Sequence, residues 1–547
     1  MRPATIENNE EHGFRRHCIA AALVACALLL TRAATVRGEA IELLPPVEQP
    51  QLGADANPST PLAANRIAAS EPTGLPSTAL VDNQEPPATP LERLADLEDR
   101  FDEMTQRMIE AAQAPEEFPT FRITGFTQLD GGWYQQTPKN EQQVGDAQDA
   151  VGFRRVRLGV VGKVSEFTNY MVELDFATAG RPSFFDIWVE QGNIPYFGTV
   201  RGGQYCQPFS VDALTGFRNL TFLERSLPFL AFVPFRRVGV MAYNGTEDAR
   251  TNWAVSGFKT GGFNNAPLGD DRFGIDLGDV GGWSFTGRAT HLLYFDEHAA
   301  DRYVWHVGAS YDYSMMSANT AAGSTSPVPF YQARTTPEFG PLGYTDQVQN
   351  FGQAFAYTPV FVDTGKYAAD HFNLFGVETL YQAGPFGFTS EWMGSVVQSS
   401  TAGPIFYHGA YGQVAYRLTG ENRLYDRRTG TLGKVVPFTD FISLTRGRRG
   451  VHGWGAWEVA ARLSYVSLHN PANLVYLPGS NGYGQGTLTD TTLGMTWFLN
   501  TYLKLQFNWI HAMLENTGYP AAPTPGVQAT RGFSLADLYV TRLQVDF

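Results

Sequence analysis

Apolar and polar residues alternate along repeated segments of the chain between residues 121 and 547. Within Tyr303–Tyr313, and again within Trp457–Tyr465, every second residue is aromatic or aliphatic. Strands in soluble sheets are usually about 5 to 6 residues long, whereas a tilted strand that crosses a bilayer needs about 9 to 11 residues. Because these segments run to about ten residues, the alternation predicts membrane-crossing strands with one face toward lipid and one toward water.

Sixteen such segments can be placed along the sequence. They begin near residues 121, 153, 169, 184, 199, 237, 252, 283, 303, 372, 386, 407, 454, 487, 501 and 533. Only helices and closed barrels satisfy the backbone in lipid, and apart from one stretch near the N-terminus no run approaches the roughly 18 to 20 apolar residues of a membrane helix. We therefore expect an all-β fold, a sixteen-stranded antiparallel transmembrane β-barrel over residues 118–547. The charged share of 17%, against about 25% in ordinary domains, fits an apolar wall.

Connection lengths predict which end of the barrel faces outward. Connections after even-numbered strands are often short, as at Val164–Thr168 and Gln382–Pro385, and those after odd-numbered strands are mostly longer. Short inner turns and long outer loops are typical of outer-membrane barrels. One inner connection, Thr419–Gly453, is long and carries seven basic and three acidic residues. It could guide anions at the inner exit, contact the acidic segment that precedes the barrel, or be a solvated loop.

The N-terminus predicts export from the cytoplasm. A basic flank precedes the apolar run Cys18–Leu30, and small residues follow up to a possible cleavage site after Ala40. This order describes a signal peptide over residues 1–40. A lipoprotein signal ending at Cys26 is the alternative. After cleavage at residue 40, Cys206 is the only cysteine, so no intrachain disulfide can form.

Two segments lie between the signal peptide and the barrel. Residues 41–90 contain ten prolines and predict a disordered linker. Apolar residues at heptad spacing over residues 91–114 predict a short coiled-coil helix, with a single amphipathic helix as the alternative. Residues 41–117 hold 4 basic and 15 acidic side chains. Because the whole chain has a net charge of -14, most of the negative charge lies in this segment and the barrel itself is nearly neutral. The acidic balance argues against nucleic acid as a partner.

The C-terminal segment carries a further signal of an outer-membrane barrel. Leu543, Val545 and the terminal Phe547 share one face of the last predicted strand, and Arg542 and Gln544 share the other. Many outer-membrane barrels end in an aromatic residue with this alternation, which the barrel-insertion machinery reads. We therefore expect Phe547 to contact that machinery and the outer wall to contact outer-membrane lipid.

Six collinear motifs resemble the phosphate-selective porin O and P family. They are Gly125–Tyr134, Gly152–Gly159, Gly203–Ser210, Leu220–Leu227, Leu418–Asp426 and Gly455–Leu463. The resemblance implies a trimeric sixteen-stranded porin whose anion path is lined by arginines and narrowed by an inward-folded third outer loop, which spans Gln207–Phe235 here. The chain departs from the family at Cys206-Gln207, where the family's motif usually continues with Lys-Glu.

Alternation in the second predicted strand assigns its arginines to faces. If Val156 and Leu158 face lipid, Arg155 and Arg157 point into the lumen. An arginine at the hydrocarbon midplane would cost about 2 to 4 kcal/mol, which favours this arrangement. In a regular register Arg154 would face lipid, unless it lies at the rim.

The resemblance also implies which residues contact anions. By matching motifs, Arg154, Arg155 and Arg225 correspond to the family's anion-contacting arginines. With Arg157 from the strand and Arg218 from the third loop, they are the candidate pore residues. Simple wall polarity is the alternative, since water-filled barrels have polar interiors whatever they conduct. Four inward carboxylates would weaken anion preference or brace the arginines: Glu173, Asp175, Asp186 and Glu190.

These patterns predict an outer-membrane porin for passive diffusion of small anions such as phosphate, assembled as a homotrimer and without a cofactor. One alternative is a structural barrel tethered to the cell wall by its N-terminal segment. The other is an outer-membrane enzyme, but the sequence contains no Gly-x-Ser-x-Gly nucleophile elbow and no recognisable histidine constellation.

Overall fold

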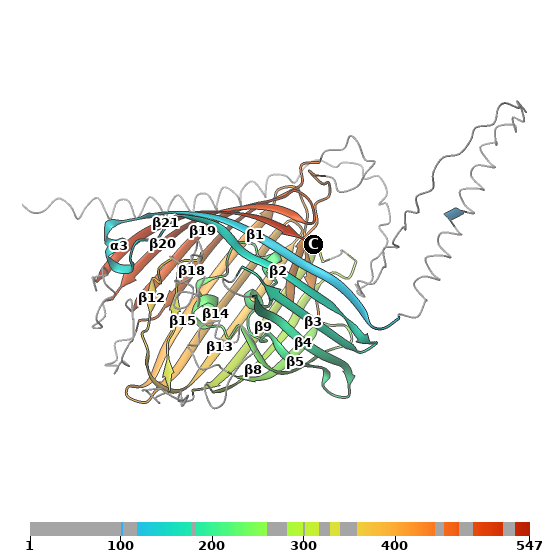
Figure 1. Cartoon of the computed structure of the whole chain (residues 1–547), viewed down its shortest axis with the longest axis horizontal. Helices are drawn as coiled ribbons and strands as arrows, with labels where there is room; N and C mark the ends of the chain where they lie inside the picture. Colours follow the sequence, from blue (N-terminus) through green and yellow to red (C-terminus); the bar gives the residue numbers. More distant parts are fainter. Residues whose placement is uncertain are drawn as a thin grey trace, which may run out of the picture. The chain divides into compact units, whose positions relative to one another are not determined.

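A closed antiparallel barrel dominates the computed structural model of the chain (Figure 1). The structure describes residues 100–101, 117–177, 182–259, 282–298, 301–316, 329–339, 358–442, 453–469, 485–517 and 531–547. Sixteen strands within these residues form the barrel. They are β1 (Thr120–Gln136), β2 (Ala150–Ser165), β3 (Thr168–Asp175), β4 (Ser183–Ile194), β5 (Gly198–Cys206), β6 (Arg236–Gly245), β7 (Thr251–Lys259), β8 (Trp283–Phe295), β9 (Tyr303–Met315), β13 (Tyr367–Ala383), β14 (Phe386–Ser399), β15 (Gly403–Arg417), β18 (Ala456–Ser467), β19 (Gly486–Phe498), β20 (Leu503–Asn516) and β21 (Gly532–Asp546).

The first and last strands close the barrel. β1 pairs antiparallel with β21 from Phe126 opposite Asp546 to Gln136 opposite Ala536. Beyond the end of β21, the backbone of Phe547 exchanges two hydrogen bonds with Gly125, at 2.9 and 3.0 Å. The predicted fold and strand number are confirmed, and each predicted strand start lies within five residues of an observed one.

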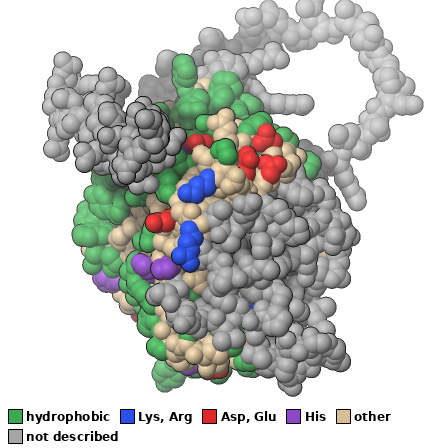
Figure 2. All heavy atoms as spheres, turned by 90° about the vertical axis from the view of Figure 1, so that its left-hand side faces the viewer, with side chains coloured by type: hydrophobic (Ala, Val, Ile, Leu, Met, Phe, Trp, Pro, Cys, Tyr) green, Lys and Arg blue, Asp and Glu red, His purple; other side chains and the backbone are tan. Residues whose placement is uncertain are grey.

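Burial alternates along the strands in the sense opposite to that of a soluble protein. In β20 the polar residues Lys504, Gln506 and Asn508 are buried inside the barrel, whereas Leu505 and Phe507 are exposed on its outer wall. Exposure of these apolar side chains to water would be unfavourable in free energy, whereas their contact with lipid is favourable. In the view of Figure 2, hydrophobic side chains gather along the edge of the barrel and charged side chains lie nearer the centre of the visible face.

The connections follow the predicted asymmetry. On the end that we assign as inner, β2 joins β3 through residues 166–167 and β13 joins β14 through residues 384–385. On the outer end, residues 207–235 join β5 to β6 and residues 316–366 join β9 to β13. We call 207–235 the third loop and 316–366 the fifth loop. The outer connection between β14 and β15 is an exception, because it spans only residues 400–402.

Three connecting segments lie inside the barrel and bury their side chains there. The third loop contains α4 (Val211–Leu214), η1 (Phe217–Asn219) and α5 (Leu227–Phe232), and α5 contacts β14, β15 and β18. The fifth loop contributes β10 (Phe330–Tyr331), β11 (Arg334–Thr335) and β12 (Val362–Asp363). The long inner connection contributes a hairpin of β16 (Arg423–Asp426) and β17 (Thr431–Val435), which contacts η1.

An apolar cluster forms where the third and fifth loops meet inward-facing wall residues. Phe229 and Phe235 of the third loop are in edge contact, with ring centroids 5.3 Å apart. Phe339 of the fifth loop belongs to the same cluster. Ile510 and Val540 contribute from the wall. This part of the interior is therefore a packed apolar core. The alternation of the strands predicted only a polar lumen, so this core was not expected.

The segments predicted before the barrel fall almost entirely outside the described residues. The signal peptide over 1–40 and the linker over 41–90 are not described, and of the coiled coil over 91–114 only Arg100 and Phe101 are, both helical. Among the described helices, none is long and apolar enough to cross a membrane.

A side chain at Gly125 should destabilise barrel closure. A Cβ there would lie 2.5 Å from the carbonyl oxygen of Arg157 and 2.4 Å from Cζ of Phe547. Gly125→Val therefore forces the backbone of β1 or β2 to move, which typically costs about 1 to 3 kcal/mol. We expect the refolded variant to lose its compact, fast-migrating electrophoretic form at a lower temperature than the wild type.

Gly202→Val is the matched control. A Cβ at Gly202 in β5 meets no atom within 4 Å, and the residue faces outward beside Val189. We expect its transition temperature to equal that of the wild type. Equal transition temperatures for the two variants would contradict this account of closure.

Candidate functional site

A β-bulge in β2 turns two consecutive arginines into the lumen. Gln128 of β1 pairs with Arg155, but the next residue, Leu129, pairs with Phe153, so Arg154 is an extra residue in β2. Bulges re-aim side chains in this way. The expectation that Arg154 faces lipid in a regular register is wrong, because the register is interrupted at this residue. Its side chain is 12% exposed and faces the lumen beside Arg155.

Glu224 of the third loop joins these arginines to the last strand. Arg154 Nε donates to Glu224 Oε1 at 3.0 Å, and Arg155 Nη2 donates to Oε2 at 2.8 Å. Arg542 of β21 donates through Nη2 to Oε1 at 2.9 Å and also pairs with Asp130 of β1 at 2.6 Å. One carboxylate of the third loop thus binds three guanidinium groups of the wall.

Arg157 lies inside the barrel, as predicted, and is paired with carboxylates of the neighbouring strand. Its Nε donates to Asp175 at 2.9 Å, and Nη1 lies 3.8 Å from Glu173. Its guanidinium carbon lies 3.2 Å from the ring centroid of Phe185 and 4.6 Å from that of Phe217. The predicted bracing between inward acids and arginines is confirmed here.

The same bracing recurs along β4, β5 and β6. Arg236 contacts Asp186 at 2.8 Å, and Arg201 contacts Glu190 at 2.5 Å. Removing one partner of a buried pair leaves an uncompensated charge and costs about 3 to 5 kcal/mol. These arginines therefore hold the inner surface together, and their carboxylates reduce the positive charge that a solute would meet.

Arg225 is enclosed within the third loop. Its Nε donates to the carbonyl of Asp212 at 2.7 Å, and Nη2 donates to the carbonyls of Ala213 at 3.0 Å and Thr215 at 2.7 Å. The guanidinium also lies 3.9 Å from the ring centroid of Phe217. Burial lowers the pKa of Arg225 to about 10, and Asp212 opposes that effect. The side chain is 1% exposed, so this geometry fits a residue that positions the loop.

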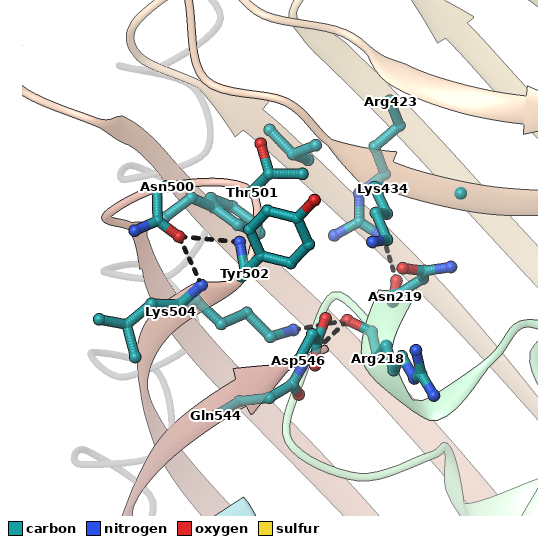
Figure 3. A pocket seen from close by; sticks show the side chains of 14 residues that line it. Arg218, Asn219, Arg423, Lys434, Asn500, Thr501, Tyr502, Lys504, Gln544 and Asp546 are labelled. Atoms are coloured by element: carbon teal, nitrogen blue, oxygen red, sulfur yellow. Dashed lines mark hydrogen bonds between the residues drawn. The ribbon is translucent and has the colours of Figure 1, made fainter. Parts of the chain in front are cut away.

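Arg218 lines a cavity of about 350 Å³ between the third loop, the inner hairpin and the turn from β19 to β20 (Figure 3). Its Nη2 donates to Thr124 at 2.9 Å. Lys504 of β20 donates to the carbonyl of Arg218 at 2.9 Å, and Arg423 of the hairpin donates to the carbonyl of Asn219 at 2.6 Å. Three separate elements therefore meet at η1.

Basic side chains outnumber acidic ones around this cavity. Arg218, Arg423, Lys434 and Lys504 line it, and among the described lining residues Asp546 is the only acid. Burial lowers the pKa of Arg218 and of Lys434, and Asp546 opposes the shift in both cases. Such a cavity favours small anions because ammonium and guanidinium groups offer charge-assisted hydrogen bonds.

The structure brings the five predicted arginines together around the third loop. Arg154 and Arg155 share Glu224, and Arg155, Arg157 and Arg225 all lie near Phe217. Arg218 lines the cavity and also lies near Arg157, because the two guanidinium carbons lie 5.0 and 5.2 Å from the ring centroid of Phe126. The sequence analysis did not assign a site role to several residues that contact or accompany these arginines, although each lies in a recognised pattern. Glu224 lies in the motif Leu220–Leu227, and Lys434 lies in the basic inner connection. Arg542 and Lys504 lie on polar strand faces.

A closed sixteen-stranded barrel with an apolar outer wall, a charged interior and an inward third loop has the architecture of a porin. The family model "Phosphate-selective porin O and P" matches residues 121–547, and the chain belongs to this family. The chain is therefore a bacterial outer-membrane protein of the porin class, and family and fold indicate a channel.

Curated relatives agree with this assignment. The chain is 24% identical over 460 residues to Porin O of Pseudomonas aeruginosa, covering 81% of this chain and 92% of that protein. It is 26% identical over 355 residues to an uncharacterized protein of Caulobacter vibrioides, covering 64% of this chain and 62% of the other.

Two solved outer-membrane proteins also match the chain. OmpT of Vibrio cholerae in its trimer form has a TM-score of 0.44 at 11% identity, covering 79% of this chain and all of the other. An anion-selective porin from Comamonas acidovorans has a TM-score of 0.42 at 11% identity, covering 78% of this chain and all of the other.

Replacing Arg225 should loosen the third loop. Lysine has no fork of donors and cannot reach all three carbonyls, so Arg225→Lys leaves buried carbonyl groups unpaired at about 1 to 3 kcal/mol each. We expect faster amide hydrogen exchange across residues 211–235, measured by mass spectrometry on the detergent-solubilised barrel. Arg250→Lys, at an exposed arginine of the turn between β6 and β7, is the control and should leave exchange in this loop unchanged. Unaltered exchange in Arg225→Lys would show that the loop does not depend on this residue.

Proposed function

We propose that the protein is a porin for the passive diffusion of small anions such as phosphate. The observation that carries this proposal is the cavity between the third loop and the inner hairpin, with its four basic residues and one acid. Arg218 and the ammonium groups of Lys434 and Lys504 would attract an anion, and Arg423 would do so less because Glu458 pairs with it at 3.0 Å. The similarity to Porin O also supports this proposal.

The five predicted arginines have different parts in this proposal. Arg218 would contact the anion in the cavity. Arg154, Arg155 and Arg157 would add positive potential to the lumen while bound to carboxylates, and Arg225 would act by holding the third loop in place. Cys206 carries no charge at the position where the family's motif usually has lysine, so selectivity for phosphate over chloride would be weaker than a lysine there would give.

We also propose that the protein works as a homotrimer. The apolar wall supports lateral packing of barrels in a membrane, and closed cyclic assemblies are usual for oligomers of one chain. In this proposal residues 1–40 direct export, residues 91–114 associate as a coiled coil, and Phe547 is read during insertion.

Reversal potentials in planar bilayers test the channel directly. We expect the purified protein to open stepwise, ohmic channels, because a water-filled lumen conducts in proportion to voltage. In a potassium chloride gradient the sign of the reversal potential should show anion preference, and potassium phosphate should carry current as well. Absence of conductance would exclude the porin, and cation preference would exclude the anion pathway.

Neutralising the cavity should reduce anion preference. At pH 6, where the Lys504 amine is protonated, Lys504→Gln removes a positive charge from the cavity wall while keeping a hydrogen-bond donor for the carbonyl of Arg218. We expect the anion-to-cation permeability ratio to fall at least twofold at low ionic strength, where screening is weakest. Arg250→Gln, which removes an exposed charge outside this cavity, should leave the ratio unchanged. Equal ratios in Lys504→Gln and the wild type would contradict the role of the cavity.

A further inference from the structure

The binding of Glu224 by three arginines is the arrangement that an anion site would have. Arg154 and Arg155 approach from β2 and Arg542 approaches from β21, with four nitrogen-to-oxygen distances of 2.8 to 3.1 Å. The three arginines come from the wall, whereas Glu224 comes from the third loop. Guanidinium groups that converge on one carboxylate present the charge-assisted donors that phosphate or a free carboxylate requires.

The wall supports these guanidinium groups independently of Glu224. Arg155 Nη1 donates to Gln128 of β1 at 2.8 Å. Arg542 donates through Nε to Asp130 at 2.7 Å. Because these contacts do not involve Glu224, they would keep Arg155 and Arg542 in place if that carboxylate lost its charge.

The cluster borders a second cavity, of about 320 Å³, between the third loop and the wall. Glu224 lines this cavity together with Asp212 of the same loop and Tyr411 of β15. Arg423 and Arg462 line it as well. The carboxylate therefore lies between the arginine cluster and this cavity.

We propose that Glu224 is a specificity-determining residue, whose carboxylate occupies the position in which Arg154, Arg155 and Arg542 would otherwise hold a permeating oxyanion. This inference rests on the proposed anion channel. The three arginines face two carboxylates, Glu224 and Asp130, so the cluster carries a net charge of about +1. Without the charge of Glu224 the net charge would double.

Glu224→Gln tests the proposal because it keeps the size of the side chain and removes its charge. In planar bilayers at low salt we expect the anion-to-cation permeability ratio to rise at least twofold. We also expect millimolar inorganic phosphate to block the chloride current of the variant and to leave the wild-type current largely intact, since the vacated position accepts an oxyanion. An unchanged ratio together with absent block would overturn the proposal.

A second substitution separates charge from loop displacement. In Glu224→Gln/Arg154→Gln the net charge returns to that of the wild type, so the permeability ratio should return as well. If the third loop had simply left its place, the second substitution would not restore the ratio, and that result would also overturn the proposal. Glu297→Gln, which removes an exposed carboxylate paired with Arg427, is the matched control and should behave as the wild type.

Arg154→Gln alone provides a test that does not depend on folding of the Glu224 variant. It leaves two arginines facing two carboxylates, so the permeability ratio should fall below that of the wild type. An unchanged ratio in a conducting Arg154→Gln channel would count against the proposal, whereas a wild-type protein without conductance would instead refute the porin function on which it rests.

Discussion

Backbone hydrogen bonding in lipid is the constraint on which the rest of this structure depends. A strand edge left open in the membrane would expose unpaired amide and carbonyl groups at several kcal/mol each. Pairing of β1 with β21 removes the last such edge, and Phe547 extends that pairing to the end of the chain. Closure then forces every strand to have a lipid face and a lumen face, which places the charged side chains together in a confined interior.

Confinement makes ion pairs the main connection between the loops and the wall. Glu224 anchors the third loop to β2 and β21, and Glu338 anchors the fifth loop to Arg462 of β18 at 2.8 Å. The inner hairpin is held by uncharged acceptors instead, because Arg288 of β8 donates hydrogen bonds to the carbonyls of Thr429 and Gly430. Each of the two ion pairs neutralises part of the positive charge inside the barrel, so the contacts that place the loops also lower the charge of the interior.

Alternation along the chain was sufficient to predict the barrel, since the period of two is clear in long strands such as β20 and β21. It also predicted the inward direction of Arg155 and Arg157. It could not predict the bulge at Arg154, because a single extra residue leaves no periodic signal. Alternation also could not predict where the loops lie, because Glu224 and Glu338 pair with arginines that are distant in the sequence. The packed core around Phe229 depends on the same contacts.

The bulge in β2 has a consequence for how such a site can arise. Residues on either side of Arg154 pair with β1 in regular antiparallel fashion. A chain lacking that one residue could pair without interruption, and no other strand would need a new partner or a new face. The barrel therefore accommodates the extra arginine by a local kink in β2. Insertions elsewhere in a strand would instead exchange its lipid and lumen faces.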